Sequence, residues 1–355
     1  MKIGIPREIK PLEGRVALSP EACSSLVQHG HSVFIETSAG RLSGYADADY
    51  RAAGAAIADD AATLYGSAGL IVKVKEPVAG DLALLRSDHL LFCYLHLAPN
   101  PELTRQLRDI GLTAVGFETV ETDHGELPLL APMSDIAGRL AVQIGTHLLH
   151  QPQGGKGVLL GGLPGVARGH VVIIGAGNAG GNAAAMAAAI GAEVVVFDVR
   201  RERLGAMRSL GNNVTALYPY TDRLRSEVAR ADLLIGATLQ TGTRTPHIVS
   251  RDMVASMQPG SVIVDISVDQ GGCVETTRPT SYAAPTYVEE GVVHFCVTNM
   301  PGAVPRSATQ ALSSALLPYV LQLSGADWEQ QAPLQRAVNV RAGEVVHPAL
   351  RATLD

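Results

Sequence analysis

The sequence predicts an α/β protein with two domains, each built on a parallel β-sheet with helices on its faces. Three observations predict this class. Short apolar runs alternate with helix-like stretches along most of the chain. A length of 355 residues fits two domains of ordinary size, each able to bury a core. A glycine-rich turn between two apolar runs marks one domain as a nucleotide-binding unit.

The glycine turn lies between two predicted strands. An apolar run, Val171–Ile174, precedes it and predicts a buried strand. An Ala-rich segment, Asn182–Ile190, follows it and predicts a helix, because alanine is the strongest helix former. Glu193–Phe197 predicts the next strand, which ends on Asp198. The alternative is a βαβ unit that binds no nucleotide, and the agreement of strands, turn, helix and terminal acid disfavours it.

The glycines and the acid each have a physical reason. Gly175 permits a tight turn, Gly177 lets the backbone approach a pyrophosphate, and Gly180 lets the helix lie close to the sheet. The N-terminus of that helix directs N–H groups toward the phosphates. Asp198 is placed to accept from the ribose hydroxyls and repels a 2′-phosphate, which predicts NAD rather than NADP. Three arginines follow the acid and can soften that preference: Arg200, Arg201 and Arg203.

Composition excludes several classes of protein. Hydrophobic residues make up 46% and charged residues 17%, a balance typical of compact globular proteins. A net charge of −6 gives no basic surface for nucleic acid or anionic membrane. We expect a cytoplasmic protein, since the N-terminus is strand-like and no apolar run reaches the length of about 18 residues needed to span a membrane. The four cysteines have neither metal nor disulfide spacing, and we expect reduced thiols in the core: Cys23, Cys93, Cys273 and Cys296.

Residues 1–130 repeat a strand–helix rhythm that predicts a parallel sheet. The expected strands are Lys2–Ile5, Ser32–Glu36, Gly69–Val74, Leu90–Leu95 and Thr113–Phe117. Ser19 is the expected cap of a first helix, and further helices are expected near 47–66, 78–87 and 100–110. In such sheets ligands bind at the carboxyl ends of the strands.

Three ionisable residues follow strands of this region and are predicted to meet at that edge. Arg15 lies in the loop after the first strand, Lys75 ends the strand near 71–75, and His96 follows the strand Leu91–Leu95. Alone, each is explained as a solvated charge or a polar cap. Together they predict an anion pocket with an acid–base group, because Arg and Lys bind carboxylates and an imidazole titrates near neutral pH.

The second region begins near Pro132. Ser134 is the expected cap of a helix that ends near His150, where His147 and His150 fall on the surface and no metal site is expected. Asp269 follows a strand and lies at a carboxyl edge, with a turn residue as the alternative. The expected strands are Val214–Leu217, Leu233–Ala237, Val262–Ile266 and His294–Val297, with helices near 200–210, 221–230 and 250–257. A last helix, Ser307–Leu323, is predicted to kink at Pro318, and residues 326–355 to pack on the first domain.

Long motifs in a single order connect the chain to a known family. They are GIPREIK (4–10), EGRVALSP (13–20), VKVKEP (72–77), YLHLA (94–98), PMSDIAGRLA (132–141), GGKGVLLGG (154–162), VDISVDQGG (264–272) and NMPGAVPR (299–306). With them the chain resembles the family of alanine dehydrogenase and the nucleotide-binding subunit of proton-pumping transhydrogenase. The resemblance implies two doubly wound, Rossmann-type domains with a cleft between them. Residues 1–130 plus 305–355 form the substrate domain, and 131–304 the NAD-binding domain.

The resemblance also implies an activity, an assembly and roles for residues. The activity is reversible oxidative deamination of L-alanine to pyruvate, ammonium and NADH, and the assembly is a homohexamer. Arg15 and Lys75 hold the substrate carboxylate, His96 is the acid–base group, and Asp269 lies beside the nicotinamide. The implied NAD contacts are Ser134, Gly175, Gly177, Gly180, Asp198, Arg203 and Asn299. Three alternatives stay open: a dehydrogenase for another 2-oxo acid, a transhydrogenase-type NAD-binding subunit, and a regulatory NAD-binding protein without turnover.

The chain departs from the family pattern in three places. Asp135 stands where Glu is usual, which changes little. The segment Leu239–Gly242 replaces a more apolar one that ends in Pro-Gly, and this can alter cofactor or substrate preference. The chain also ends early, which can affect subunit contacts.

Overall fold

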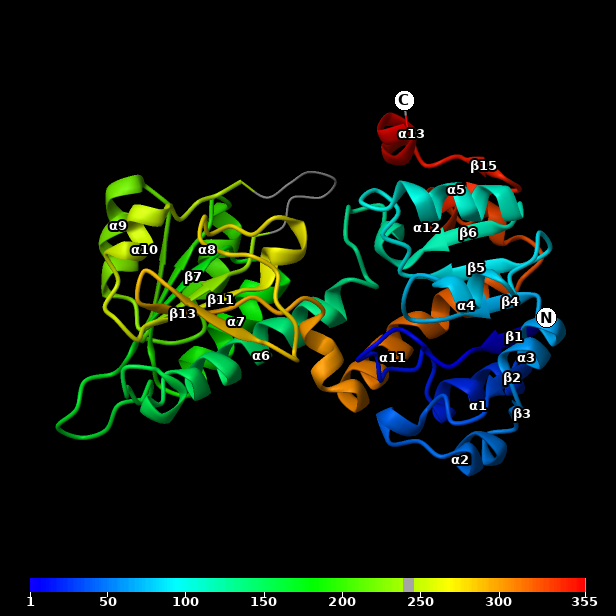
Figure 1. Cartoon of the computed structure of the whole chain (residues 1–355), viewed down its shortest axis with the longest axis horizontal. Helices are drawn as coiled ribbons and strands as arrows, with labels where there is room; N and C mark the ends of the chain where they lie inside the picture. Colours follow the sequence, from blue (N-terminus) through cyan, green and yellow to red (C-terminus); the bar gives the residue numbers. More distant parts are fainter. Residues whose placement is uncertain (239–245, 355) are drawn as a thin grey trace. The chain divides into compact units, whose positions relative to one another are not determined.

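The computed structural model describes residues 1–238 and 246–354 and divides into two compact units (Figure 1). The first comprises residues 1–133 and 302–355, and the second residues 134–301. The sequence places its boundaries after residues 130 and 304. Each unit holds one sheet of mostly parallel strands with helices, so the predicted α/β class is confirmed.

The sheet of the first unit has eight strands in the order β15-β14-β6-β5-β4-β1-β2-β3. The six N-terminal strands are mutually parallel, and their order is that of a doubly wound fold. Two C-terminal strands add an antiparallel edge, because β14 pairs with β6 and β15 with β14. The strands are β1 (Lys2–Ile5), β2 (Ser32–Glu36), β3 (Ala56–Ala58), β4 (Leu70–Val72), β5 (Leu90–Cys93), β6 (Thr113–Gly116), β14 (Val338–Arg341) and β15 (Glu344–Val345).

The pairing of β14 with β6 confirms that the C-terminal segment packs on the first domain. The helices of this unit are α1 (Pro20–Gln28), α2 (Asp47–Ala52), α3 (Ala61–Ser67), α4 (Ala79–Leu82), α5 (Pro101–Ile110), α11 (Pro305–Leu323), α12 (Ala332–Arg336) and α13 (Pro348–Leu354). Ser19 caps α1 as predicted, its hydroxyl accepting from the Ala22 N–H. Pro318 lies inside α11, and its kink stays a prediction.

Two predicted helices of this unit are wrong. The stretch 47–66 is divided into α2, strand β3 and α3, because Gly54 adopts a positive φ of 86° that ends the first helix. The stretch 78–87 contains only the four-residue helix α4. The short strand β3 pairs with β2, so the tertiary ladder overrides a helical composition.

The sheet of the second unit has seven strands in the order β12-β13-β11-β10-β7-β8-β9. Six are parallel and repeat the order found in the first unit, and β12 forms an antiparallel edge on β13. The strands are β7 (His170–Ile174), β8 (Glu193–Phe197), β9 (Val214–Leu217), β10 (Leu233–Gly236), β11 (Val262–Asp265), β12 (Thr286–Glu289) and β13 (Val292–Phe295). The helices are α7 (Asn178–Ala189), α8 (Arg201–Arg208), α9 (Thr221–Arg230) and α10 (Arg251–Ala255).

Two predictions in this unit need correction. The last strand is β13, which starts two residues before the predicted His294–Val297, because it pairs with the unforeseen strand β12. Helix α6 (Ala131–Leu148) begins before Ser134, so Ser134 lies in its first turn and is not its cap. Pro132 favours this earlier start, since proline is tolerated in the first helical turn.

The cores confirm the burial predicted for the cysteines. All four are buried free thiols. In the first unit Cys93 packs with Leu64, Ile71 and Leu91, all fully buried. Among the helices of residues 1–238 and 246–354, none is long and apolar enough to cross a membrane.

Candidate active site

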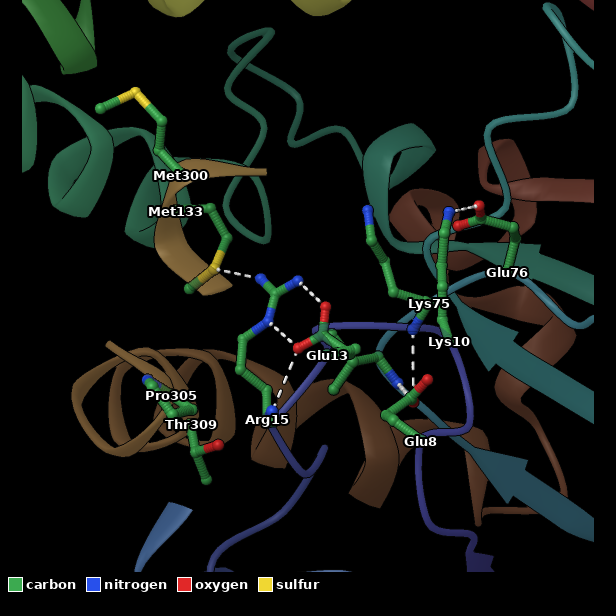
Figure 2. A network of polar contacts seen from close by, with 12 residues as sticks. Glu8, Lys10, Glu13, Arg15, Lys75, Glu76, Met133, Met300, Pro305 and Thr309 are labelled. Carbon is green, nitrogen blue, oxygen red and sulfur yellow. Dashed lines mark hydrogen bonds and ion pairs between the residues drawn. The ribbon is translucent and has the colours of Figure 1, made fainter. Parts of the chain in front are cut away.

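The three ionisable residues of the first unit lie after adjacent strands, and we call Arg15, Lys75 and His96 the cationic rim. Arg15 follows β1, Lys75 follows β4 and His96 follows β5. Strand β4 lies between β1 and β5, and the strand order reverses at β1 and β4. This switch point is where open α/β sheets bind ligands. In Figure 2 the side chains of Arg15 and Lys75 extend toward the same side of the sheet edge.

Arg15 is held by Glu13, and both side chains are buried. The Arg15 Nε lies 2.7 Å from Glu13 Oε1, and its Nη2 lies 2.5 Å from Oε2. The Arg15 backbone N–H also donates to Oε1, at 3.0 Å. Burial of the guanidinium lowers the pKa of Arg15. The Glu13 carboxylate raises it by more, so the pKa of Arg15 is raised overall. The Nε and Nη2 groups, which can together bind a carboxylate with two hydrogen bonds, therefore already bind Glu13. The Nη1 group donates to the Met133 sulfur at 3.1 Å.

Lys75 is half-buried, and its ammonium makes no ion pair with residues 1–238 or 246–354. Its neighbours Lys10 and Glu76 pair with each other instead (Figure 2). Burial lowers the pKa of Lys75, and the positive charges of Arg15 and Lys10 lower it further. The Glu76 carboxylate raises this pKa, but the net shift is downward. A half-buried ammonium with a lowered pKa is suited to bind a small anion and to polarise a carbonyl oxygen.

His96 is exposed and strained, and two neighbours hold it. Its φ of 46° is in the left-handed region, which is uncommon for a residue with a side chain. The Glu118 Oε1 accepts from the His96 N–H at 2.6 Å and also from the Leu95 N–H at 3.1 Å. The His96 ring stacks on the Tyr94 ring, with centroids 5.8 Å apart and an interplanar angle of 10°. These contacts fix the imidazole beside the sheet edge.

Three glutamates hold the cationic rim, and none of them is among the site residues predicted from the sequence. A glutamate accepts backbone N–H groups at each rim residue: Glu13 at Arg15, Glu8 at Lys75 and Glu118 at His96. For Glu13 the spacing of two residues was a usable signal. Glu8 and Glu118 lie 67 and 22 residues from their partners, so only the fold brings them together.

In the second unit the glycine turn follows β7, and we call Gly175, Gly177, Gly180 and Asp198 the glycine rim. Gly175 has a φ of 100°, which favours glycine. A Cβ on Gly180 would lie 1.8 Å from the Gly175 oxygen, so α7 packs against the turn at the closest possible approach. Among residues 1–238 and 246–354, a Cβ on Gly177 would approach only the Arg203 guanidinium, at 3.6 Å. The space before the N-terminus of α7 is thus kept open, which fits a pyrophosphate.

Asp198 directly follows β8 and supports the turn. Its Oδ2 accepts from the Ala176 N–H at 2.7 Å, and its Oδ1 accepts from the Arg200 N–H at 2.8 Å. The Arg203 Nη1 lies 3.6 Å from Oδ2. Each carboxylate oxygen keeps a second lone pair, so ribose hydroxyls fit the same group. Arg200 and Arg201 are exposed at the start of α8.

Asp269 is exposed in a short 3₁₀ segment, Ile266–Gln270, directly after β11. The buried residue that supports this segment is Asp265, which sequence reasoning overlooked. Its carboxylate accepts from the Ser267 and Cys273 N–H groups, both at 2.9 Å, and from the Thr277 hydroxyl at 2.8 Å. Burial raises the pKa of Asp265, against the effect of these hydrogen bonds. Asp265 anchors the backbone that carries Asp269.

The remaining predicted contacts lie at the ends of elements. Ser134 is in the first turn of α6, and Asn299 adopts a left-handed φ of 57° before the 3₁₀ segment Met300–Ala303. Asp135 accepts from the Asn182 side chain of α7 at 2.9 Å, so this departure from the family pattern has a packing role. The segment Leu239–Gly242 lies outside the described residues.

The fold and the two rims are typical of one class of protein. These are oxidoreductases that are built of doubly wound domains and use a pyridine nucleotide. Family models agree, since the alanine dehydrogenase/PNT N-terminal domain matches residues 4–137 and the C-terminal domain matches residues 141–348. The chain belongs to this family. It is 48% identical to an alanine dehydrogenase of Halomonas elongata, over 99% of this chain and 96% of that protein. It is 45% identical to the alanine dehydrogenase of Bacillus subtilis, over 99% and 94%.

Solved structures give the same result. One described as L-alanine dehydrogenase matches 100% of this chain and 99% of its own, with 51% identity and a TM-score of 0.97. A transhydrogenase from Sinorhizobium meliloti matches 98% of this chain and 100% of its own, with 28% identity and a TM-score of 0.84. Both similarities span both units.

Proposed function

We propose that the chain catalyses the reversible oxidative deamination of L-alanine to pyruvate and ammonium with NAD. One observation carries the proposal: Arg15, Lys75 and His96 follow neighbouring strands at the switch point of the first sheet. Two cations and an imidazole match a small 2-oxo acid that needs a carboxylate anchor and proton transfer. The high identity to alanine dehydrogenases over the whole chain supports alanine as the substrate.

The glycine rim would hold the pyridine nucleotide, which when bound would supply a reversible acceptor for the hydride of the α-carbon. Gly177 and the N–H groups of α7 face the pyrophosphate, and Gly180 keeps the helix close enough to do so. Asp198 accepts from the adenosine ribose and disfavours a 2′-phosphate, which supports NAD over NADP. Arg203 neutralises part of the negative charge of Asp198, so the preference for NAD is tested directly by comparing NADH with NADPH. Ser134 and Asn299 are the further proposed contacts.

The cationic rim holds the substrate. Lys75 binds the carboxylate with its ammonium and polarises the C2 oxygen as the carbonyl forms. Arg15 adds charge through the Nη1 end of its guanidinium, where a carboxylate is a stronger acceptor than the Met133 sulfur. Glu13 keeps the guanidinium in one orientation.

His96 moves the protons of the hydrolytic half of the reaction. Its imidazole takes a proton from the water that adds to the imine carbon and returns one to nitrogen as ammonium leaves. The Tyr94 ring and Glu118 hold the imidazole in place for this. Asp269 is the further proposed catalytic residue, and it stands on a segment that Asp265 anchors.

A spectrophotometric assay with purified protein tests the proposal. We expect NADH oxidation with pyruvate plus ammonium, much slower oxidation with NADPH, and lower kcat/KM with longer 2-oxo acids. Best activity with another 2-oxo acid would identify a related amino-acid dehydrogenase. NADH binding without oxidation would favour a transhydrogenase-type or regulatory nucleotide-binding protein.

The family resemblance also suggests a homohexamer in the cytoplasm. Light scattering coupled to size-exclusion chromatography measures the assembly, and cell fractionation with an antibody measures the location. A single peak at the mass of one chain would contradict the hexamer.

A further inference from the structure

A buried carboxylate lies directly behind Lys75. The Glu8 side chain is 2% exposed and comes from the loop after β1. Its Oε1 accepts from the Val74 N–H at 2.6 Å and from the Lys75 N–H at 3.3 Å. Figure 2 shows Glu8 at the backbone of Lys75, while the Lys75 side chain extends away from it. Glu8 therefore contacts the backbone of this rim residue and makes no ion pair with its ammonium among the described residues.

A buried lysine, Lys73, lies beside Glu8 and lowers the pKa of its carboxyl group, but burial has the larger effect and the pKa of Glu8 is raised. The Lys73 side chain is 1% exposed, and its Nζ lies 3.4 Å from Glu8 Oε2 and 2.9 Å from Asp81 Oδ2. Asp81 in turn accepts from the Tyr65 hydroxyl at 2.9 Å and from the Val78 N–H at 3.0 Å. Burial opposes the charge of Lys73, but the two carboxylates outweigh it and raise its pKa. Removing Lys73 would leave two buried carboxylates without this cation, which is costly, whereas removing the Glu8 charge leaves Lys73 paired with Asp81.

The two lysines, which are two residues apart in the sequence, therefore have different roles. Lys73 supplies the charge that Glu8 needs inside the protein, so the attraction between Glu8 and the Lys75 ammonium is reduced. The Glu8 carboxylate then serves as an acceptor for the backbone at the end of β4. A backbone held by a charged acceptor is fixed more firmly than one held by neutral groups.

We propose that Glu8 is a positioning residue for Lys75: it fixes the Lys75 backbone at the end of β4, and the buried Lys73 keeps its carboxylate from pairing with the Lys75 ammonium. The proposal rests on the function proposed above for Lys75, which is to bind the substrate carboxylate. Glu8 acts through Lys75 and does not touch substrate itself.

Two conservative substitutions of Glu8 distinguish the effect of its side-chain length from the effect of its charge. Glu8→Asp keeps the charge for Lys73 but is one methylene too short to reach the Val74 and Lys75 N–H groups. Glu8→Gln keeps an acceptor oxygen at full reach but removes the charge. We expect Glu8→Asp to raise the pyruvate KM about 10-fold with a smaller change in kcat, and Glu8→Gln to stay within about 3-fold while its Tm falls further.

Controls come from the same network. Asp81→Asn removes the other carboxylate on Lys73 without touching the Lys75 backbone, and we expect a lower Tm with an unchanged KM. Lys75→Ala gives the full effect of losing the ammonium, and Glu8→Asp added to Lys75→Ala is expected to raise KM no further, because both act on one group.

The outcomes are distinct. If Glu8→Gln raises the pyruvate KM more than Glu8→Asp does, or if the two are equal, Glu8 is only the buried partner of Lys73 and the inference fails. If Lys75→Ala itself leaves the pyruvate KM unchanged, the substrate function of Lys75 fails, whatever the Glu8 variants do.

Discussion

The two sheets share one strand order, and their candidate residues occupy the same topological position, yet the rims differ in construction. At the end of β7 the glycine rim offers backbone N–H groups, and among the described residues the nearest contact of a Cβ added at Gly177 would be the Arg203 guanidinium. At the ends of β1, β4 and β5 the cationic rim offers charged side chains, and a glutamate holds the backbone at each of them.

The difference matches what each rim is proposed to bind. A pyrophosphate is recognised by consecutive N–H groups of one turn, so its requirements are local and appear as glycines at fixed spacing. A small carboxylate needs cations from separate loops, and each loop needs a fixed conformation. The glutamates provide that conformation, and the buried side chains of Glu8 and Glu13 place more charge inside the first unit.

Among the variants that test this comparison, we expect the largest effect from removing the imidazole of His96. We expect His96→Ala to lower kcat by about 100-fold or more, because general acid–base catalysis contributes that much, while the Kd for NADH stays unchanged. Steady-state kinetics and fluorescence titration of NADH measure the two quantities. His124→Ala, an exposed histidine of the same unit, is the matched control. Full turnover in His96→Ala would remove His96 from the mechanism.

The Arg15–Glu13 pair tests whether binding and stability can be separated. Arg15→Met alone leaves Glu13 buried without its partner, so we expect a lower Tm as well as a higher pyruvate KM. Arg15→Met combined with Glu13→Gln removes both charges. We expect Tm to recover while KM stays about 10- to 100-fold above the native value, the equivalent of a lost charged hydrogen bond. A native KM in the double variant would exclude Arg15 from substrate binding.

Two glycines of the other rim should respond differently to the same added methyl group. Gly177→Ala places a Cβ 3.6 Å from the Arg203 Nη1, an ordinary contact, so we expect the Tm to be unchanged. Its methyl group fills the approach of the pyrophosphate, and we expect about 10-fold weaker NADH binding.

Gly180→Ala places a Cβ 1.8 Å from the Gly175 oxygen, so the helix has to shift. We expect it to destabilise the unit by about 1–3 kcal/mol, which lowers Tm by several degrees. Calorimetry and NADH titration of both variants measure the contrast, and equal Tm values would contradict the close packing of α7.

The smallest expected effect is a pH dependence. The pKa of Lys75 is lowered from its ordinary value of 10.5, chiefly by burial. Its ammonium is lost as pH rises through that lowered pKa, so the pyruvate KM should rise over the alkaline range. Lys75→Arg keeps its charge there, because the guanidinium pKa exceeds about 12, and its KM should stay flat. An equal alkaline rise in Lys75→Arg would assign the titration to another group.

The residue pattern along the chain was enough to predict the α/β class and the glycine turn. It also located the strands β1, β2, β7, β8 and β9 within one residue at each end. These features depend on local chemistry: apolar runs, caps and glycines at fixed spacing act within a few residues. Arg15, Lys75 and His96 were found for the same reason, since each follows a recognisable strand.

The contacts that support these three residues depend on how distant parts of the chain come together in the fold. Glu8 and Glu118 meet the rim from 67 and 22 residues away, and the strand β14 pairs with β6 across more than half the chain. A charged residue in a sequence is expected on the surface, and only the strand order turns these glutamates inward beside donors. Burial then gives Lys75 its lowered pKa, which no local pattern contains.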